Sequence, residues 1–102
     1  MTPDIVVFRD STPLLVVDVK YKAKPAREDR SQVITYAVGY GTSLGLLICP
    51  ASGGQRQGLR SLGLVNNQIQ VDEYYFNLAA EDLVTEEQKL VQVVANLIKQ
   101  SS

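Results

Sequence analysis

Two stretches near the start of the chain are rich in β-branched and aliphatic residues and are separated by a short polar segment. Residues 4–9 read DIVVFR and residues 14–21 read LLVVDVKY, while residues 10–13 read DSTP. β-Branched residues favour strands, and Asp, Ser, Thr and Pro favour turns. The pattern therefore predicts two antiparallel strands joined by a short turn.

The apolar positions that follow change from strand-like to helical spacing. Residues 22–27 (KAKPAR) contain a proline and show no periodicity, which predicts a loop leading into a helix that begins near Asp29 or Ser31. The continuous apolar run at 44–49 (LGLLIC), closed by Pro50, predicts a buried strand. A strand, a helix and a strand in this order predict a crossover with parallel pairing of the two strands. The apolar stripe of the helix consists of Val33, Ile34, Ala37, Val38 and Gly41.

The second half of the chain predicts another hairpin and a final helix. LRSLGLV and QIQVDEYYFNL flank Asn66 and Asn67, which tolerate the left-handed backbone of a tight turn. Residues 85–88 (TEEQ) match a capping box, in which Thr85 caps a helix that runs to about Gln100. The side chains expected to pack inward from this helix are Leu90, Val91, Val94, Leu97 and Ile98.

Length and composition are those of one ordinary globular domain. The 102 residues are 45% apolar and 21% charged, and with the order of elements above they predict a single α/β domain over residues 1–102. No apolar run approaches the ~20 residues that cross a bilayer, and the N-terminus lacks a basic segment followed by an apolar one. We therefore expect a cytoplasmic protein without a membrane partner.

The sequence contains no histidine and one cysteine, Cys49, which lies within the apolar run of the third predicted strand. Without histidine, Ser-His-Asp catalysis and histidine zinc sites are excluded, and Cys49 lacks the usual base of a nucleophilic thiol. We expect Cys49 to be buried and inert. Any metal must be held by oxygen ligands, which suit Mg²⁺, Mn²⁺ or Ca²⁺.

Charge is unevenly distributed along the chain, although the net charge is only -1. Residues 1–60 carry eight Lys or Arg against five Asp or Glu, and residues 61–102 carry two against six. A basic cluster is either a solvated face or a surface that follows DNA phosphates. The basic residues that fall within eleven positions of one another are Lys20, Lys22, Lys24, Arg27 and Arg30.

The chemistry of the chain is concentrated in the first predicted hairpin. Asp18 and Lys20 are two positions apart on a strand, so their side chains point to the same face. Two charges on a largely buried strand are costly to desolvate unless each has a partner or a metal, and the antiparallel neighbour can supply a second acid, Asp4. Hydrolysis of a phosphodiester requires carboxylates that hold a divalent ion and a cation near the nucleophile. The alternative is that Asp18 and Lys20 form only a buried ion pair.

Three ordered segments of the chain resemble the motifs of a nuclease family. PDIVVF, LLVVDVKYK and SQVITYAVGYG match the PD, D-x-K and Q-x-x-x-Y signatures of the PD-(D/E)xK nuclease superfamily. The chain is most similar to the nuclease subunit (McrC-like) of McrBC-type 5-methylcytosine-specific restriction systems, and more distantly to RecB-like nucleases. The resemblance implies a restriction-endonuclease-like fold, in which a small mixed sheet is flanked by helices, and a DNA endonuclease that depends on Mg²⁺ or Mn²⁺.

The resemblance also implies roles for individual residues. Asp4 and Asp18 match metal ligands, and the Val19 carbonyl is a third candidate ligand. Lys20 matches the residue that positions the attacking water and stabilises the developing charge. Gln32 and Tyr36 match the Q-x-x-x-Y pair beside the metal site and the DNA backbone, and residues four apart share one face of a helix. The DNA contacts expected from the basic cluster are Lys22, Lys24, Arg27 and Arg30.

One element of the superfamily is missing from the sequence. Its members usually carry a glutamate on an N-terminal helix, whereas Asp4 is preceded by three residues here. We expect the acid to come from a longer protein, a further protein subunit or a second copy, or metal binding to be weak; Glu28 is a further candidate. Two alternatives to the nuclease stay open: a catalytically weak or inactive DNA-binding or assembly domain with the nuclease fold, and a structural interaction module.

Overall fold

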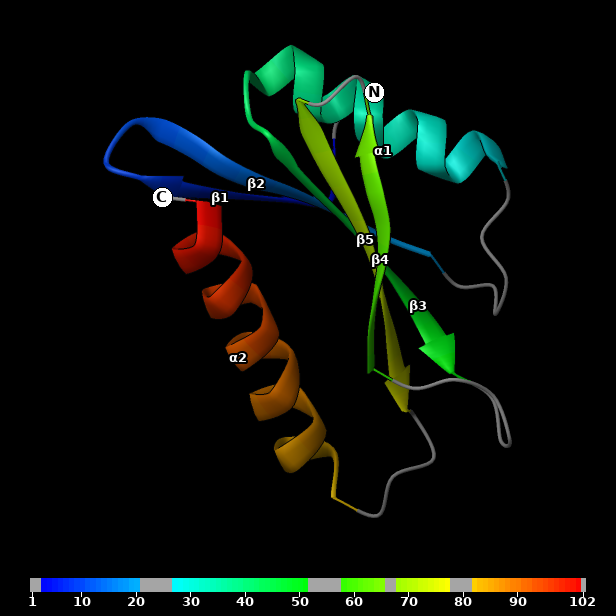
Figure 1. Cartoon of the computed structure of the whole chain (residues 1–102). Coiled ribbons are helices and arrows are strands. Elements are labelled where there is room, and N and C mark those ends of the chain that lie inside the picture. Colours follow the sequence, from blue (N-terminus) through cyan, green and yellow to red (C-terminus); the bar gives the residue numbers. More distant parts are fainter. Residues whose placement is uncertain (1–2, 21–26, 52–57, 66–67, 78–81, 102) are drawn as a thin grey trace.

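The protein is described by a computed structural model, in which a five-stranded sheet carries one helix on each face (Figure 1). The residues described are 3–20, 27–51, 58–65, 68–77 and 82–101. The elements, in chain order, are β1 (Ile5–Arg9), β2 (Thr12–Val19), α1 (Arg27–Tyr40), β3 (Leu44–Ala51), β4 (Gly58–Val65), β5 (Ile69–Asn77) and α2 (Leu83–Ser101).

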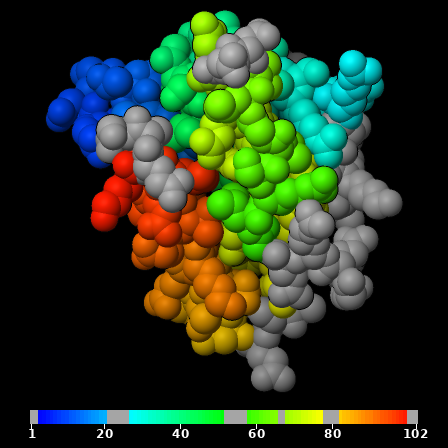
Figure 2. All heavy atoms as spheres, viewed as in Figure 1, coloured from blue at the N-terminus to red at the C-terminus, as the bar shows by residue number. Residues whose placement is uncertain are grey.

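The sheet is mixed, with strand order β1-β2-β3-β5-β4. The three inner strands β2, β3 and β5 are parallel, and the edge strands β1 and β4 pair antiparallel with β2 and β5. Both predicted hairpins and the parallel pairing across α1 are therefore confirmed. The turn between Asn66 and Asn67 lies outside the described residues. β4 lies on the surface in the space-filling view, beside α2 (Figure 2), and most of its residues are exposed.

Alternation along the strands divides the core into two layers. Val16, Leu47 and Val71 point to one face of the sheet and pack with Val33 and Ala37 of α1. On the other face, Leu97 of α2 packs with sheet side chains that include Leu15, Val17, Leu44, Leu46 and Tyr74. The even positions of β2 consequently face α1, and this alternation decides where the charged residues of that strand lie.

The helices differ from the sequence prediction in which residues they bury. α1 begins at Arg27, and Val38 keeps 65% of its surface while Tyr36 keeps only 8%. In α2, Val91 keeps 67%. The predicted stripes are wrong at these two valines. Each valine follows a buried or partly buried residue in the sequence and therefore lies about 100° further around the helix. The sheet covers only one side of each helix, so the valine is left exposed. Gly41 follows α1 with φ of +70° and is not part of its apolar stripe.

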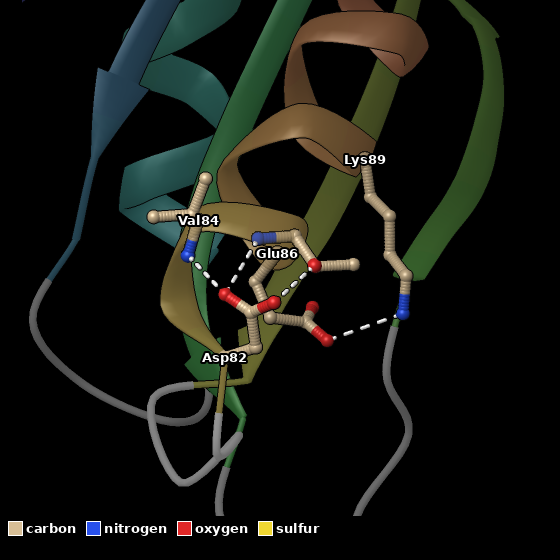
Figure 3. A network of polar contacts seen from close by, with 5 residues as sticks. Asp82, Val84, Glu86 and Lys89 are labelled. Carbon is tan, nitrogen blue, oxygen red and sulfur yellow. Dashed lines mark hydrogen bonds and ion pairs between the residues drawn. The ribbon is translucent and has the colours of Figure 1, made fainter.

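The start of α2 is capped by Asp82 (Figure 3). The backbone amides of Val84 and Thr85 donate to Asp82 Oδ1 at 3.1 and 3.2 Å, and the Thr85 hydroxyl donates to Asp82 Oδ2 at 2.6 Å. These hydrogen bonds, led by the Thr85 hydroxyl, lower the pKa of the Asp82 carboxyl. Thr85 is thus already inside the helix, and the prediction that it caps α2 is wrong because Asp82, three residues earlier, takes up the first amides. Among the described residues, no helix is long and apolar enough to cross a membrane.

Candidate functional site

Asp18 and Lys20 lie at the carboxyl end of β2, on the face covered by α1. The Lys20 backbone amide donates to the Ile48 carbonyl at 2.8 Å, so Lys20 continues the pairing with β3. The Lys20 ammonium nitrogen is 2.9 Å from Asp18 Oδ2, and Asp18 is only 5% exposed. The prediction that these two side chains share a face is confirmed, and they form a largely buried ion pair.

Two residues of α1 complete the surroundings of the Lys20 ammonium group. Lys20 Nζ donates to Gln32 Oε1 at 2.9 Å and lies 3.6 Å from Asp29 Oδ1. The close polar contact with Asp18 raises the pKa of Lys20, Asp29 adds to this, and burial opposes it. Lys20 is therefore held in its protonated form by two carboxylates and oriented by an amide oxygen.

Asp4 lies beside this pair at the start of β1. Its Oδ2 accepts a hydrogen bond of 2.8 Å from the Val19 amide, and its side chain is otherwise at the surface. The antiparallel ladder of β1 and β2 begins with the pair Ile5 and Val17, so Asp4 lies just before that ladder, at the end of β2 where Asp18 is found. The structure thus places the Asp4 carboxylate on the backbone of Val19, between Asp18 and Lys20 in the chain.

The oxygen donors at this end of β2 suit a hard divalent cation in type. Asp18 Oδ2 is buried and lies 2.9 Å from the Lys20 ammonium nitrogen. A cation could share such an oxygen. Across residues 3–20, 27–51, 58–65, 68–77 and 82–101, however, no three acidic or cysteine side chains converge in a way that could hold an ion. The donor set therefore fits a metal with two carboxylates and lacks a third.

A second polar cluster lies in the same layer, on β5. Glu73 is fully buried; Arg30 Nε donates to its Oε2 at 3.1 Å, and the Tyr75 hydroxyl donates to its Oε1 at 3.1 Å. Leu47 pairs with Asp18 on one side and with Glu73 on the other, so the two acids occupy one row of the sheet. Two strand spacings separate them by roughly 10 Å. Arg30 and Asp29 are adjacent on α1, so the two clusters fix its first turn against β2 and β5.

Cys49 is buried between these clusters, with 1% of its surface exposed. Burial, reinforced by the negative charges of Glu73 and Asp29, raises the pKa of the thiol from 9.0 to about 11. The thiolate, which is the nucleophilic form, is therefore suppressed at neutral pH. The burial expected from the sequence is confirmed.

Folding stability is expected to fall as pH rises from about 9 to about 11. The pKa of Cys49 is higher in the folded than in the unfolded chain, so its contribution is complete below pH 9 and is lost as pH rises through about 11. A rise of that size corresponds to about 2 to 3 kcal/mol. Thermal melts of the wild type and Cys49→Ala across this range measure the effect. The difference in slope isolates the thiol, since Lys20, Tyr74 and Tyr75, whose pKa values are also raised, are present in both proteins. Parallel profiles would contradict the expectation.

The remaining predicted site residues are distributed around α1. Tyr36 is buried one turn after Gln32, and its ring packs in the α1 layer of the core. Arg27 is exposed at the first position of α1, and the Arg30 side chain is 41% exposed although its Nε is engaged by Glu73. Lys22 and Lys24 lie outside the described residues.

Two acids of the site, Asp29 and Glu73, are missing from the sequence prediction. Asp18 was recognised as a candidate because it is a charged residue on an apolar strand face. Glu73 shares its face of β5 with Ile69 and Val71, so the same pattern in β5 would have identified Glu73. Asp29 carried no such signal, because an acid in the first turn of a helix is ordinary and its ion pair with Lys20 joins separate elements.

Comparison of the chain with protein-family models, with curated proteins and with solved structures gave no match.

Proposed function

We propose that this domain is the core of a DNA endonuclease of the PD-(D/E)xK type, in the manner of McrC-like subunits, that depends on Mg²⁺ or Mn²⁺. One observation carries the proposal. Residues from three separate motifs of the sequence, Asp4, the pair Asp18 and Lys20, and Gln32, lie together at the carboxyl end of β2. Ligand sites of sheets with parallel strands commonly lie at the carboxyl ends of those strands.

Each residue has a role in this proposal. Asp4 and Asp18, with the Val19 carbonyl, would hold the divalent ion, which when bound supplies a Lewis acid that activates water and neutralises charge on the phosphate. Lys20 would orient the attacking water and stabilise the negative charge that develops on the phosphate oxygens. Gln32 keeps the Lys20 ammonium group in place through its 2.9 Å hydrogen bond.

The basic residues near the start of α1 would bind the substrate backbone. Arg27 is exposed there, and the outer part of Arg30 remains accessible beside Glu73. With Lys22 and Lys24 they give the segment the charge that DNA phosphates require, while the chain as a whole is slightly acidic. A further subunit or a second copy would supply the third acid.

Calorimetry with Mn²⁺ tests the metal site directly. We expect binding that Asp4→Asn weakens by about 10- to 100-fold, because loss of even an outer partner of a metal site has effects of this size. Asp10→Asn is the matched control: Asp10 is an exposed acid in the turn of the same hairpin with φ of 56°, a conformation that asparagine tolerates. The same proteins are then assayed for nicking of a supercoiled plasmid with Mg²⁺. Equal Mn²⁺ affinity in wild type and Asp4→Asn would remove the metal site from this position.

A second candidate function is supported by the polar contacts that the Lys20 ammonium group already makes within the domain. Its ammonium group already contacts Asp18, Asp29 and Gln32, as expected of a structural ion pair. Together with the absence of three converging acids among the described residues, this favours a nuclease-fold domain that binds DNA or assembles with a partner without cutting. DNA binding without nicking by the wild type, at any Mg²⁺ or Mn²⁺ concentration, distinguishes this candidate.

A further inference from the structure

One face of α1 carries a hollow of about 520 Å³ that opens beside the proposed site. Pockets of this size accommodate small organic groups. The spacing of the lining residues places them along a single side of the helix over more than two turns. They are Gln32, Thr35, Tyr36, Gly39 and Tyr40.

Gly39 is the residue of this hollow that packing does not explain. A Cβ added at Gly39 would meet no atom within 4 Å, and its φ is not among the positive values found at Gly41, Gly58 and Gly63. Glycine is disfavoured inside a helix, and it is commonly retained where a backbone bends unusually or where a ligand approaches closely. The position is therefore open, and a ligand in the hollow could approach the helix backbone closely there.

The chemistry of the hollow is aromatic and, among the described residues, carries no formal charge. Tyr40 exposes 37% of its surface, and Tyr36 contributes a ring that is otherwise buried. The hollow is joined to the proposed site by Gln32, whose Oε1 is 2.9 Å from Lys20 Nζ. A flat, neutral ring on the same nucleotide as the phosphate bound at the proposed metal site would fit both features. In a nucleic acid, that ring is a base.

We propose that this hollow binds an unpaired nucleobase next to the phosphate that the domain cleaves. The inference rests on the proposed function and adds a preference for single-stranded or frayed DNA, because a base can stack on Tyr40 only when its own face is exposed. Gly39 would leave room for the base against the helix.

Binding of a short single-stranded DNA that carries 2-aminopurine tests the proposal, with Ca²⁺ in place of Mg²⁺ to prevent cleavage. Tyr40→Ala is expected to weaken binding about 5- to 150-fold, the range for loss of one stacking contact, and to abolish quenching of the fluorescent base. Tyr40→Phe keeps the ring and should bind as the wild type does. The dependence of affinity on salt should stay unchanged in both variants, because no phosphate contact is removed.

Gly39→Leu places a side chain in the hollow between Tyr36 and Tyr40. Because its Cβ meets nothing within 4 Å and leucine favours helices, this variant should melt at or above the wild-type temperature and yet bind the oligonucleotide more weakly. Val38→Ala is the matched control on the same helix, since Val38 is 65% exposed and does not line the hollow.

The outcomes separate this inference from the proposed function. If Tyr40→Ala and Gly39→Leu bind the oligonucleotide as tightly as a wild type that nicks plasmid DNA, the nucleobase site is wrong and the nuclease stands. If Tyr40→Phe loses as much affinity as Tyr40→Ala, the hydroxyl and not stacking carries the binding, and the proposal fails in that form. A wild type that neither binds the oligonucleotide nor nicks DNA removes both.

Discussion

Replacing Lys20 with methionine is expected to abolish nicking and to lower the melting temperature at the same time. Loss of one electrostatic stabiliser of a transition state typically reduces the rate about 10²- to 10³-fold. The substitution also leaves Asp18 and Asp29, both largely buried, without the ammonium group that they share. Removal of one partner of a buried ion pair costs about 3 kcal/mol or more, which is roughly 12 °C for a domain of this size. Plasmid nicking and thermal melts of the same preparations measure both effects.

The double variant Lys20→Met with Asp18→Asn separates catalysis from stability. Both members of the closest ion pair are then uncharged, so part of the lost stability should return while nicking stays absent. Lys89→Met is the matched control, because Lys89 forms an ion pair with Glu86 at 3.2 Å but its side chain is 61% exposed. Exposed pairs of this kind contribute about 0.5 kcal/mol. Nicking by Lys20→Met at the wild-type rate would refute the role proposed for Lys20.

Replacing Arg30 with methionine is expected to destabilise the domain by about 3 kcal/mol, because it leaves the carboxylate of Glu73 buried without its cation. Glu73 is fully buried. Of its described contacts, the variant would keep only the hydrogen bond of 3.1 Å that the neutral Tyr75 hydroxyl donates to Glu73 Oε1. Urea denaturation measures the loss. Adding Glu73→Gln should restore part of it, since the amide carries no charge and its oxygen can still accept from Tyr75.

The control for this prediction is Arg9→Met, the same substitution at an exposed arginine at the end of β1. Surface substitutions of this kind usually change stability by about 0.5 kcal/mol or less. An Arg30→Met variant as stable as Arg9→Met would mean that the ion pair between Arg30 and Glu73 does not hold α1 on the sheet.

The amino-acid sequence by itself determined the local features of this protein. Alternating and continuous apolar runs predicted the two hairpins, the buried β3 and the crossover through α1, and all are confirmed. Alternation along β2 also placed Asp18 and Lys20 on one face. These features depend on the two-residue period of a strand and on turn chemistry, which act between near neighbours in the chain.

The tertiary structure decided everything that depends on contacts between distant segments. The chain does not reveal that β5 lies between β3 and β4, yet this order puts Glu73 in one row with Asp18. It also determines that the first turn of α1 supplies Asp29 to Lys20 and Arg30 to Glu73. Burial of a charge is set by whichever elements pack over it, and that packing is a property of the whole sheet. For the same reason helical spacing placed Val38 and Val91 in the core, whereas the sheet, which covers one side of each helix, leaves both exposed.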